Sequence, residues 1–107
     1  MAVFAEPGDF TEHVLRVVES IPAGRVMTYG DVAAVFGRYG ARAVGMVMAR
    51  SGAGVPWWRV VRAGGHPPSG LADRARRHYE AEGTPLAAAG TEDGYRVDLA
   101  RARWQPY

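Results

Sequence analysis

Apolar residues recur at helical spacing in the first part of the chain. The stripe consists of Phe10, Val14, Val17, Val18 and Ile21. Positions three or four apart form one face of an α-helix. Asp9 and Glu12 have the spacing of a capping box at its start. The pattern therefore predicts a helix that begins at Asp9 and ends at Ile21.

Two further short helices are predicted between Thr28 and Arg50. Thr28 is a good N-cap, and Asp31 at the third helical position suits the positive end of the helix dipole. The first helix ends at Gly37, and the second runs from about Ala41 to Arg50. Their inward-facing residues are Val32, Val35 and Phe36 in the first, and Val44, Val47 and Met48 in the second. Two short helices joined by the tight turn at 38–40 have the layout of a helix-turn-helix.

The second half alternates extended and helical stretches. Arg59–Arg62 is expected to be extended, with the glycine pair at 64–65 as the turn of a β-wing. A fourth helix is predicted over Ala72–Glu82, and the alternation in Tyr95–Leu99 indicates a late strand. The predicted fold class is mainly α with a small β-wing, a winged helix-turn-helix in which residues 1–107 form a single domain.

Charge favours a polyanion as partner. The net charge is only +2, but Ile21–Tyr79 contains nine arginines and two aspartates, a local excess of +7. Such a basic region in a small domain is typical of nucleic-acid binding. All thirteen basic residues are arginine, which indicates a coding bias; the bias explains the residue type but not the clustering.

Composition excludes several classes of protein. No cysteine is present, so there is no disulfide framework and no thiolate nucleophile. No run approaches the roughly 18 apolar residues of a membrane span, and no signal peptide is visible at Met1–Phe10. The histidines lack ligand spacing for a metal, and Ser20 and Ser51 at helix ends are better explained as caps than as nucleophiles. We therefore expect a cytoplasmic protein that is not an enzyme and holds no metal or cofactor.

The third predicted helix is unusually small on its outer side. Ala41, Ala43 and Gly45 surround the single long side chain of Arg42. A major-groove helix usually carries several long polar side chains, whereas small residues allow close approach to a minor groove. Efficient packing within the protein explains the small residues equally well, so this pattern alone does not decide between the two.

Two tryptophans stand side by side in VPWWRVV, residues 55–61. Neighbouring side chains of an extended segment point to opposite faces, so both indoles cannot pack on the same side. Together with IPAGRVMTYGDVAAVFG, ARAVGMVM and HYEAEG, this motif resembles the C-terminal DNA-binding domain of the methylated-DNA–protein cysteine methyltransferases. The resemblance covers about Phe10 to Gly83.

That family moves the alkyl group of O6-alkylguanine to its own cysteine, within a motif of the form Pro-Cys-His-Arg. Here the four positions read Pro56-Trp57-Trp58-Arg59, so the acceptor is missing. This departure is similar to the alkyltransferase-like branch, which carries Trp for Cys. The resemblance implies a non-enzymatic monomer that recognises O6-alkylguanine in double-stranded DNA by minor-groove binding and nucleotide flipping, without a cofactor. It also implies hand-over of the lesion to nucleotide excision repair proteins.

The resemblance also assigns roles to residues. The expected lesion pocket is lined by Tyr29, Ser51, Trp57, Arg59 and Val60. The expected DNA contacts are Thr28, Tyr29, Ala41, Arg42, Ala43 and Gly45. Tyr29 would rotate the damaged nucleotide outward, Arg42 would fill the vacated space in the stack, and Trp57 would form the pocket wall.

Further expectations concern the side chains behind and beside the pocket. Trp58 replaces the usual histidine and is expected to pack in the core, which leaves Glu82 without its expected partner. Relatives often carry an arginine near the pocket, and His66 and Arg74 are the candidates for its place. Two other functions stay open: a winged-helix transcription regulator of undamaged DNA, and a scaffold that binds proteins through its C-terminal segment.

Overall fold

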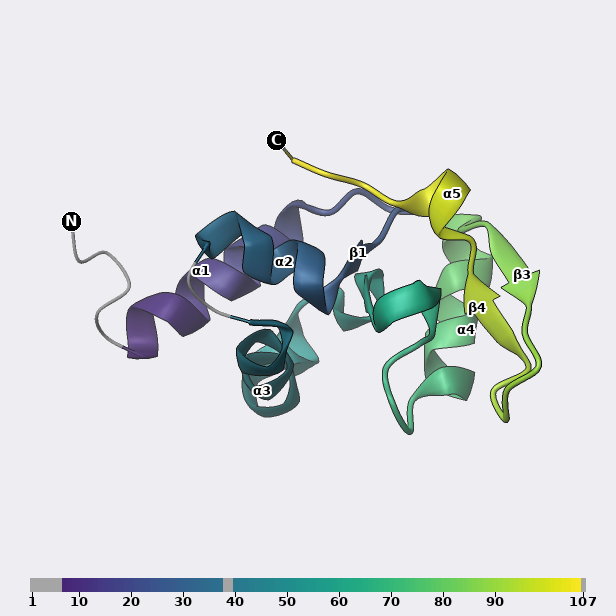
Figure 1. The fold of residues 1–107 in the computed structure, drawn as a ribbon, viewed down its shortest axis with the longest axis horizontal. Helices are drawn as coiled ribbons and strands as arrows, with labels where there is room; N and C mark the ends of the chain where they lie inside the picture. Colours follow the sequence, from purple (N-terminus) through teal and green to yellow (C-terminus); the bar gives the residue numbers. More distant parts are fainter. Residues whose placement is uncertain (1–6, 38–39, 107) are drawn as a thin grey trace.

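A computed structural model of the chain describes residues 7–37 and 40–106. The helices are α1 (Pro7–Ser20), α2 (Tyr29–Phe36), α3 (Ala41–Ser51), α4 (Ala72–Glu82) and the short α5 (Leu99–Ala102). The strands are β1 (Met27–Thr28), β2 (Val60–Val61), β3 (Leu86–Ala88) and β4 (Tyr95–Val97). Single 3₁₀ turns are η1 (Gly52–Gly54), η2 (Trp57–Arg59) and η3 (Ala63–Gly65). Helices α1–α3 lie at one end of the molecule, and α4 with the β3–β4 pair lies at the other (Figure 1).

The N-terminal helix forms as its apolar stripe predicts, because Phe10, Val14, Val18 and Ile21 are buried. It begins two residues earlier than expected, at Pro7. Proline suits the first helical position, where no backbone N–H is needed. Asp9 therefore lies inside the first turn, and its predicted role as the cap is wrong.

The cap of α2 is the one that the sequence predicts. Thr28 Oγ1 accepts a hydrogen bond from the Asp31 backbone N–H at 3.0 Å, and Asp31 Oδ2 accepts one from the Thr28 N–H at 3.1 Å. Loss of such a cap typically lowers stability by about 1 kcal/mol. This reciprocal pair fixes Tyr29 as the first residue of α2. Helices α2 and α3 pack together, which confirms the helix pair, although Arg38 and Tyr39 of its turn lie outside the described residues.

A short parallel pair of strands divides the core in two. Met27 pairs with Val60, and Thr28 pairs with Val61. Consecutive strand residues face opposite sides, so Val60 packs with α1–α3 while Val61 packs with α4 and β4. The second core consists of Val26, Val61, Ala75, Tyr79, Tyr95, Val97 and Ala102. The segment that leads into β2 therefore lies between both halves of the molecule.

The predicted position of the β-wing is wrong. Strand β2 pairs with β1, and the antiparallel pair is formed by β3 and β4 instead. The glycine pair belongs to η3, where both residues have positive φ. A Cβ on Gly65 would lie 2.1 Å from the carbonyl oxygen of Val97, so the glycine permits close packing of η3 against β4. The late strand is confirmed over Tyr95–Val97, and the fold is mainly helical with small sheets as predicted.

After α5 the chain returns to the first half and runs beside α2 (Figure 1). The Trp104 N–H donates to the carbonyl oxygen of Val26 at 2.8 Å, and the Val26 N–H donates to that of Ala102 at 3.0 Å. Arg103 forms an ion pair with Asp31, the capping residue of α2. Trp104 packs against the first core. None of the described helices is long and apolar enough to cross a membrane.

Candidate nucleic-acid interface

A pocket of about 450 Å³ opens between α3, η2 and the start of α4. Its volume is within the range of small-molecule sites, roughly 300–1,000 Å³. Its uncharged side chains include Tyr29, Met48, Ala49, Trp57 and Leu71. Arg62 and Arg74 supply the only charged groups among the described lining residues. The pocket thus combines flat and apolar walls with a positive rim.

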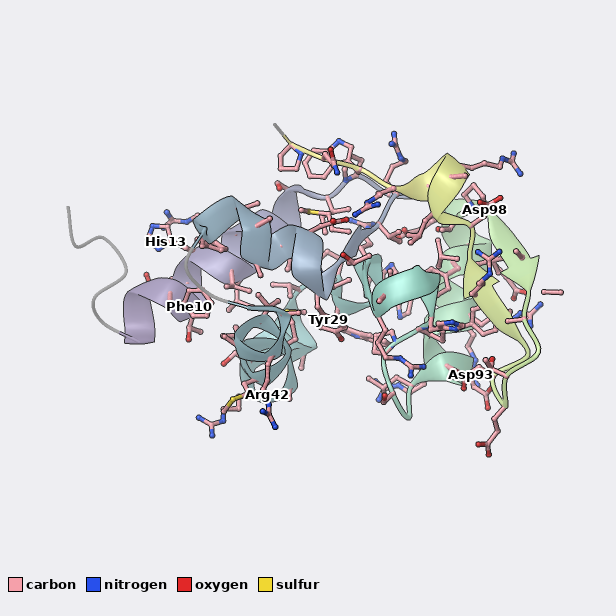
Figure 2. All side chains as sticks on the ribbon, viewed as in Figure 1. Phe10, His13, Tyr29, Arg42, Asp93 and Asp98 are labelled. Atoms are coloured by element: carbon pink, nitrogen blue, oxygen red, sulfur yellow. The ribbon has the colours of Figure 1, made fainter. Side chains whose placement is uncertain are left out.

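Tyr29 enters this pocket from the N-terminus of α2, where the Thr28–Asp31 cap holds the backbone. Figure 2 shows Tyr29 in the middle of the molecule, beside α3. Burial raises the pKa of its phenol, and the nearby Arg62 only partly opposes that effect. The hydroxyl is therefore protonated at neutral pH and can donate as well as accept a hydrogen bond.

The tryptophan pair is accommodated by the 3₁₀ turn η2. The two indole rings are nearly perpendicular, with 5.6 Å between centroids and an interplanar angle of 87°. Trp57 faces the pocket, whereas Trp58 stacks on His78 with centroids 3.6 Å apart. The His78 and Trp57 rings are also nearly perpendicular, with centroids 5.7 Å apart. Three rings therefore support one another, and only Trp57 among them lines the pocket.

Glu82 has a full set of partners, contrary to expectation. Trp58 Nε1 donates to Glu82 Oε2 at 2.9 Å, so the indole takes the place of the missing histidine. Arg59 donates to both carboxylate oxygens, at 3.1 and 2.6 Å, and the Gly24 N–H donates at 3.0 Å. Burial alone would raise the pKa of Glu82, but the hydrogen bonds from Arg59, Gly24 and Trp58 together hold it below its usual value. Glu82 is thus an ionised centre that ties η2 to α4.

Trp58 is only partly buried, at the edge of the second core rather than inside it. Its backbone is held as firmly as its ring. The hydroxyl of the fully buried Tyr79 donates to the Trp58 carbonyl oxygen at 2.5 Å. These contacts fix the turn from which Trp57 projects.

The structure does not place three of the expected pocket residues in the pocket. Arg59 turns to Glu82 and to the Ile21 carbonyl oxygen, Val60 is fully buried in the first core, and Ser51 is exposed at the end of α3. The physical reason is the local backbone. In the 3₁₀ turn η2, side chains rotate by about 120° per residue, so Arg59, two residues after Trp57, points in another direction. Val60 already belongs to strand β2, whose pairing with β1 places it in the first core, and Ser51 ends helix α3.

The arginine near the pocket is Arg74, one of the two candidates. Its guanidinium carbon lies 5.6 Å from the centre of the Trp57 ring, a cation–π distance. His66 lies instead at another shallow depression, beside β3 and α5. Arg62 also lines the pocket, although nothing in the sequence indicates it there. It reaches the rim because β2 ends there, and it is held by the Pro67 carbonyl oxygen and Asp93.

The outer face of α3 carries three of the residues expected to contact DNA. Ala41 and Arg42 are exposed and Gly45 is partly exposed, whereas Ala43 packs against the first core. Arg42 points outward from α3 (Figure 2), and it makes no ion pair with any described residue. A Cβ on Gly45 would meet nothing within 4 Å, so packing inside the protein does not require this glycine. Thr28, by contrast, uses its hydroxyl oxygen in the cap of α2.

The fold and this site define a class: a helix-turn-helix DNA-binding domain with a pocket beside its second helix. Residues 9–84 match the family described as the 6-O-methylguanine DNA methyltransferase, DNA-binding domain. The chain belongs to this family. It has no cysteine, so it cannot carry out the alkyl transfer to cysteine from which the family takes its name.

Two curated relatives are bacterial proteins called DNA base-flipping proteins. The one from Vibrio parahaemolyticus serotype O3:K6 (strain AQ3810) is 32% identical over 102 residues, which are 91% of this chain and 97% of the relative. The one from Escherichia coli (strain K12) is 39% identical over 100 residues, 89% of this chain and 74% of the relative.

Two solved structures share the fold. S. pombe Atl1 in complex with damaged DNA containing O6-carboxymethylguanine matches with a TM-score of 0.78 and 32% identity, over 92% of this chain and 97% of Atl1. An S. pombe ATL complex with DNA matches with a TM-score of 0.76 and 30% identity, over 92% of this chain and 97% of the ATL chain. Both neighbours are therefore DNA complexes of nearly the same length of chain.

Proposed function

We propose that this protein binds double-stranded DNA containing O6-alkylguanine, turns the damaged nucleotide into the pocket, and holds it there without chemical change. The observation that carries the proposal is the position of Trp57. Its ring lines the pocket at the motif position of the transferase cysteine. An indole offers a stacking surface and no nucleophile, so a reactive site becomes a binding site.

The energies are consistent with such a sensor. Turning a nucleotide out of the duplex costs a few kcal/mol, and least where the base pair is already damaged. Stacking on an aromatic ring stabilises by about 1–3 kcal/mol per base. Arg42 is exposed without an ion pair among the described residues, so it is available to fill the vacated space. A weakened pair would thus be turned out and retained, whereas an intact pair would not.

The test is equilibrium binding at fixed salt to two duplexes that differ only in O6-methylguanine or guanine. We expect the wild type to prefer the lesion. Trp57→Ala is expected to weaken lesion binding about 10- to 100-fold, from the loss of stacking, and Arg42→Ala is expected to weaken it too. Arg101→Ala, at an exposed position of α5, serves as the control. Equal wild-type affinity for the two duplexes would contradict the proposal.

Gly45→Ala separates stability from DNA binding. Alanine is favoured over glycine inside a helix by about 0.5–1 kcal/mol, and the new methyl group would enter open space. We therefore expect a more stable protein that binds both duplexes more weakly, because the methyl group would hold the DNA away. Gly90→Ala, which also meets open space, should leave binding unchanged. Chemical denaturation and the same titrations measure the two effects, and a Gly45→Ala variant with full affinity would argue against contact at this position.

The proposal extends to later steps of repair. A lesion that is bound but chemically intact has to be removed by another activity, so nucleotide excision repair proteins are the proposed partners. The curated relatives are bacterial, and bacterial DNA lies in the cytoplasm, so the proposal keeps the cytoplasmic location expected from the sequence. A monomer is sufficient, because Tyr29, Trp57 and Arg74 of one chain together form the pocket.

A further inference from the structure

Met46 stands out on the surface of α3. It is 51% exposed, the only large hydrophobic side chain exposed to this extent in the described part of the chain. It lies four residues after Arg42 and four before Arg50, so all three share one side of the helix. Helix α3 contains no acidic residue, and neither arginine pairs with a described carboxylate. Met46 is thus an exposed apolar side chain between two available cations.

Helical geometry places Met46 relative to the pocket. With about 100° between successive residues, Met46 lies about 40° from Arg42 on one side. Gly45 and Ala49, which line the pocket, lie about 60° and about 20° from Arg42 on the other side. Arg42 therefore stands between the pocket and Met46.

This order has a consequence if the proposed function holds, on which the inference rests. The pocket takes the damaged nucleotide from one strand, and Arg42 fills the gap that it leaves. The side of Arg42 away from the pocket then faces the opposite strand. We propose that Met46 is a second DNA-contacting residue, which packs in the minor groove against the strand opposite the lesion.

The chemistry of the surface favours DNA over a protein partner. Methionine is one of the apolar side chains that proteins insert into the minor groove, and its flexible thioether adapts to irregular shapes. Arg50, one turn after it, can meet a phosphate, while Arg42, one turn before it, fills the space that the damaged nucleotide leaves. One exposed thioether between two cations offers little apolar area to a protein, but it matches a groove floor bordered by phosphates.

The test compares three substitutions by titration of the O6-methylguanine duplex. Met46→Ala and the polar Met46→Gln are expected to weaken binding about tenfold, the loss for one largely buried apolar side chain. Met46→Leu is expected to stay within about twofold of the wild type, because it keeps an apolar side chain of similar volume. Alanine favours the helix, so the variant should remain folded, and thermal unfolding checks this.

Two further readouts make the role specific. Met46→Ala should leave the dependence of affinity on salt unchanged, whereas Arg50→Ala should reduce its slope by one phosphate contact. Hydroxyl-radical footprinting of the Met46→Ala complex should show lost protection on the strand opposite the lesion and unchanged protection on the damaged strand. Wild-type lesion preference together with full affinity of Met46→Ala would overturn this inference and leave the proposed function intact. Absence of lesion preference in the wild type would overturn both.

Discussion

Glu82→Gln is expected to lower the free energy of unfolding by about 2–4 kcal/mol, the range for a hydrogen-bonded ion pair that loses one partner. The carboxylate accepts four hydrogen bonds, and its side chain is only 13% exposed. A glutamine has one acceptor oxygen, and its amide group would face N–H donors of Trp58 or Arg59. The partly buried guanidinium would also lose its counter-charge. Because η2 would loosen, the preference for the lesion duplex should fall as well.

Chemical denaturation measures this loss, and the chain offers a matched control. Glu80 lies on the same helix and pairs with Arg76, but its side chain is 62% exposed. Exposed pairs of this kind contribute about 0.3–0.5 kcal/mol, so Glu80→Gln should have little effect. If Glu82→Gln destabilised the protein no more than Glu80→Gln, the central role of Glu82 would be refuted.

The same carboxylate determines part of the acid response. The pKa of Glu82 is lower in the folded protein than its usual value of 4.5. Its contribution to stability is therefore fully present above that pH and is lost as the pH falls through the folded pKa. The stability of the wild type should thus fall more steeply below about pH 4.5 than that of Glu82→Gln. The stability of Glu82→Gln should still depend on pH in the acid range, because a second carboxyl group has a lowered pKa. Partial burial would raise the pKa of Asp31, but hydrogen bonds from Arg103 and Thr28 lower it.

Gly65→Ala is expected to destabilise the fold by about 3–5 kcal/mol, the sum of backbone strain and overpacking. Gly65 has a φ of +91°, and a Cβ there would lie 2.1 Å from the Val97 carbonyl oxygen. That obstacle is backbone of β4, so no side-chain rotation relieves it. Strand β4 would have to move away from η3, which would open the second core around Val97 and Tyr95.

Gly64→Ala is the control for this prediction. Gly64 also has a positive φ, +82°, but the nearest atoms to its Cβ belong to the His66 ring at 3.3 Å, which can move. Gly64→Ala should lower the free energy of unfolding by about 1–2 kcal/mol, from backbone strain alone. The difference between the two variants in chemical denaturation isolates the effect of close packing. Equal losses would show that the contact with Val97 is not what requires glycine at position 65.

The sequence predicts the parts of this fold that depend on local patterns. The apolar stripe of α1 and the Thr28–Asp31 cap of α2 are both readable within a few residues. The predicted position of the wing is wrong because the partner of β2 is β1, far earlier in the chain. Nothing in the residues around Val60 indicates that pairing.

The motifs in the sequence predict which residues line the pocket better than they predict the contacts behind it. The motifs predict Tyr29 and Trp57 at a pocket, and both line it. The direction of Arg59 depends on a 3₁₀ turn that the local pattern did not indicate. The contact between Trp58 and Glu82 joins residues 24 positions apart. It replaces a histidine by an indole N–H, a substitution of donors that is visible only once the two elements are in contact.

The return of the chain from α5 to α2 affects the order in which the protein folds. Arg25 donates to the carbonyl oxygen of Ala102, 77 residues further on, and contacts of such sequence separation form late because a long loop must close first. Helices α1–α3 contact one another within a short stretch of chain and need no such closure. The pocket, which joins Tyr29 to Arg74, belongs with the later contacts. During synthesis the helix that we propose to face DNA therefore takes shape before the pocket that would hold the damaged base.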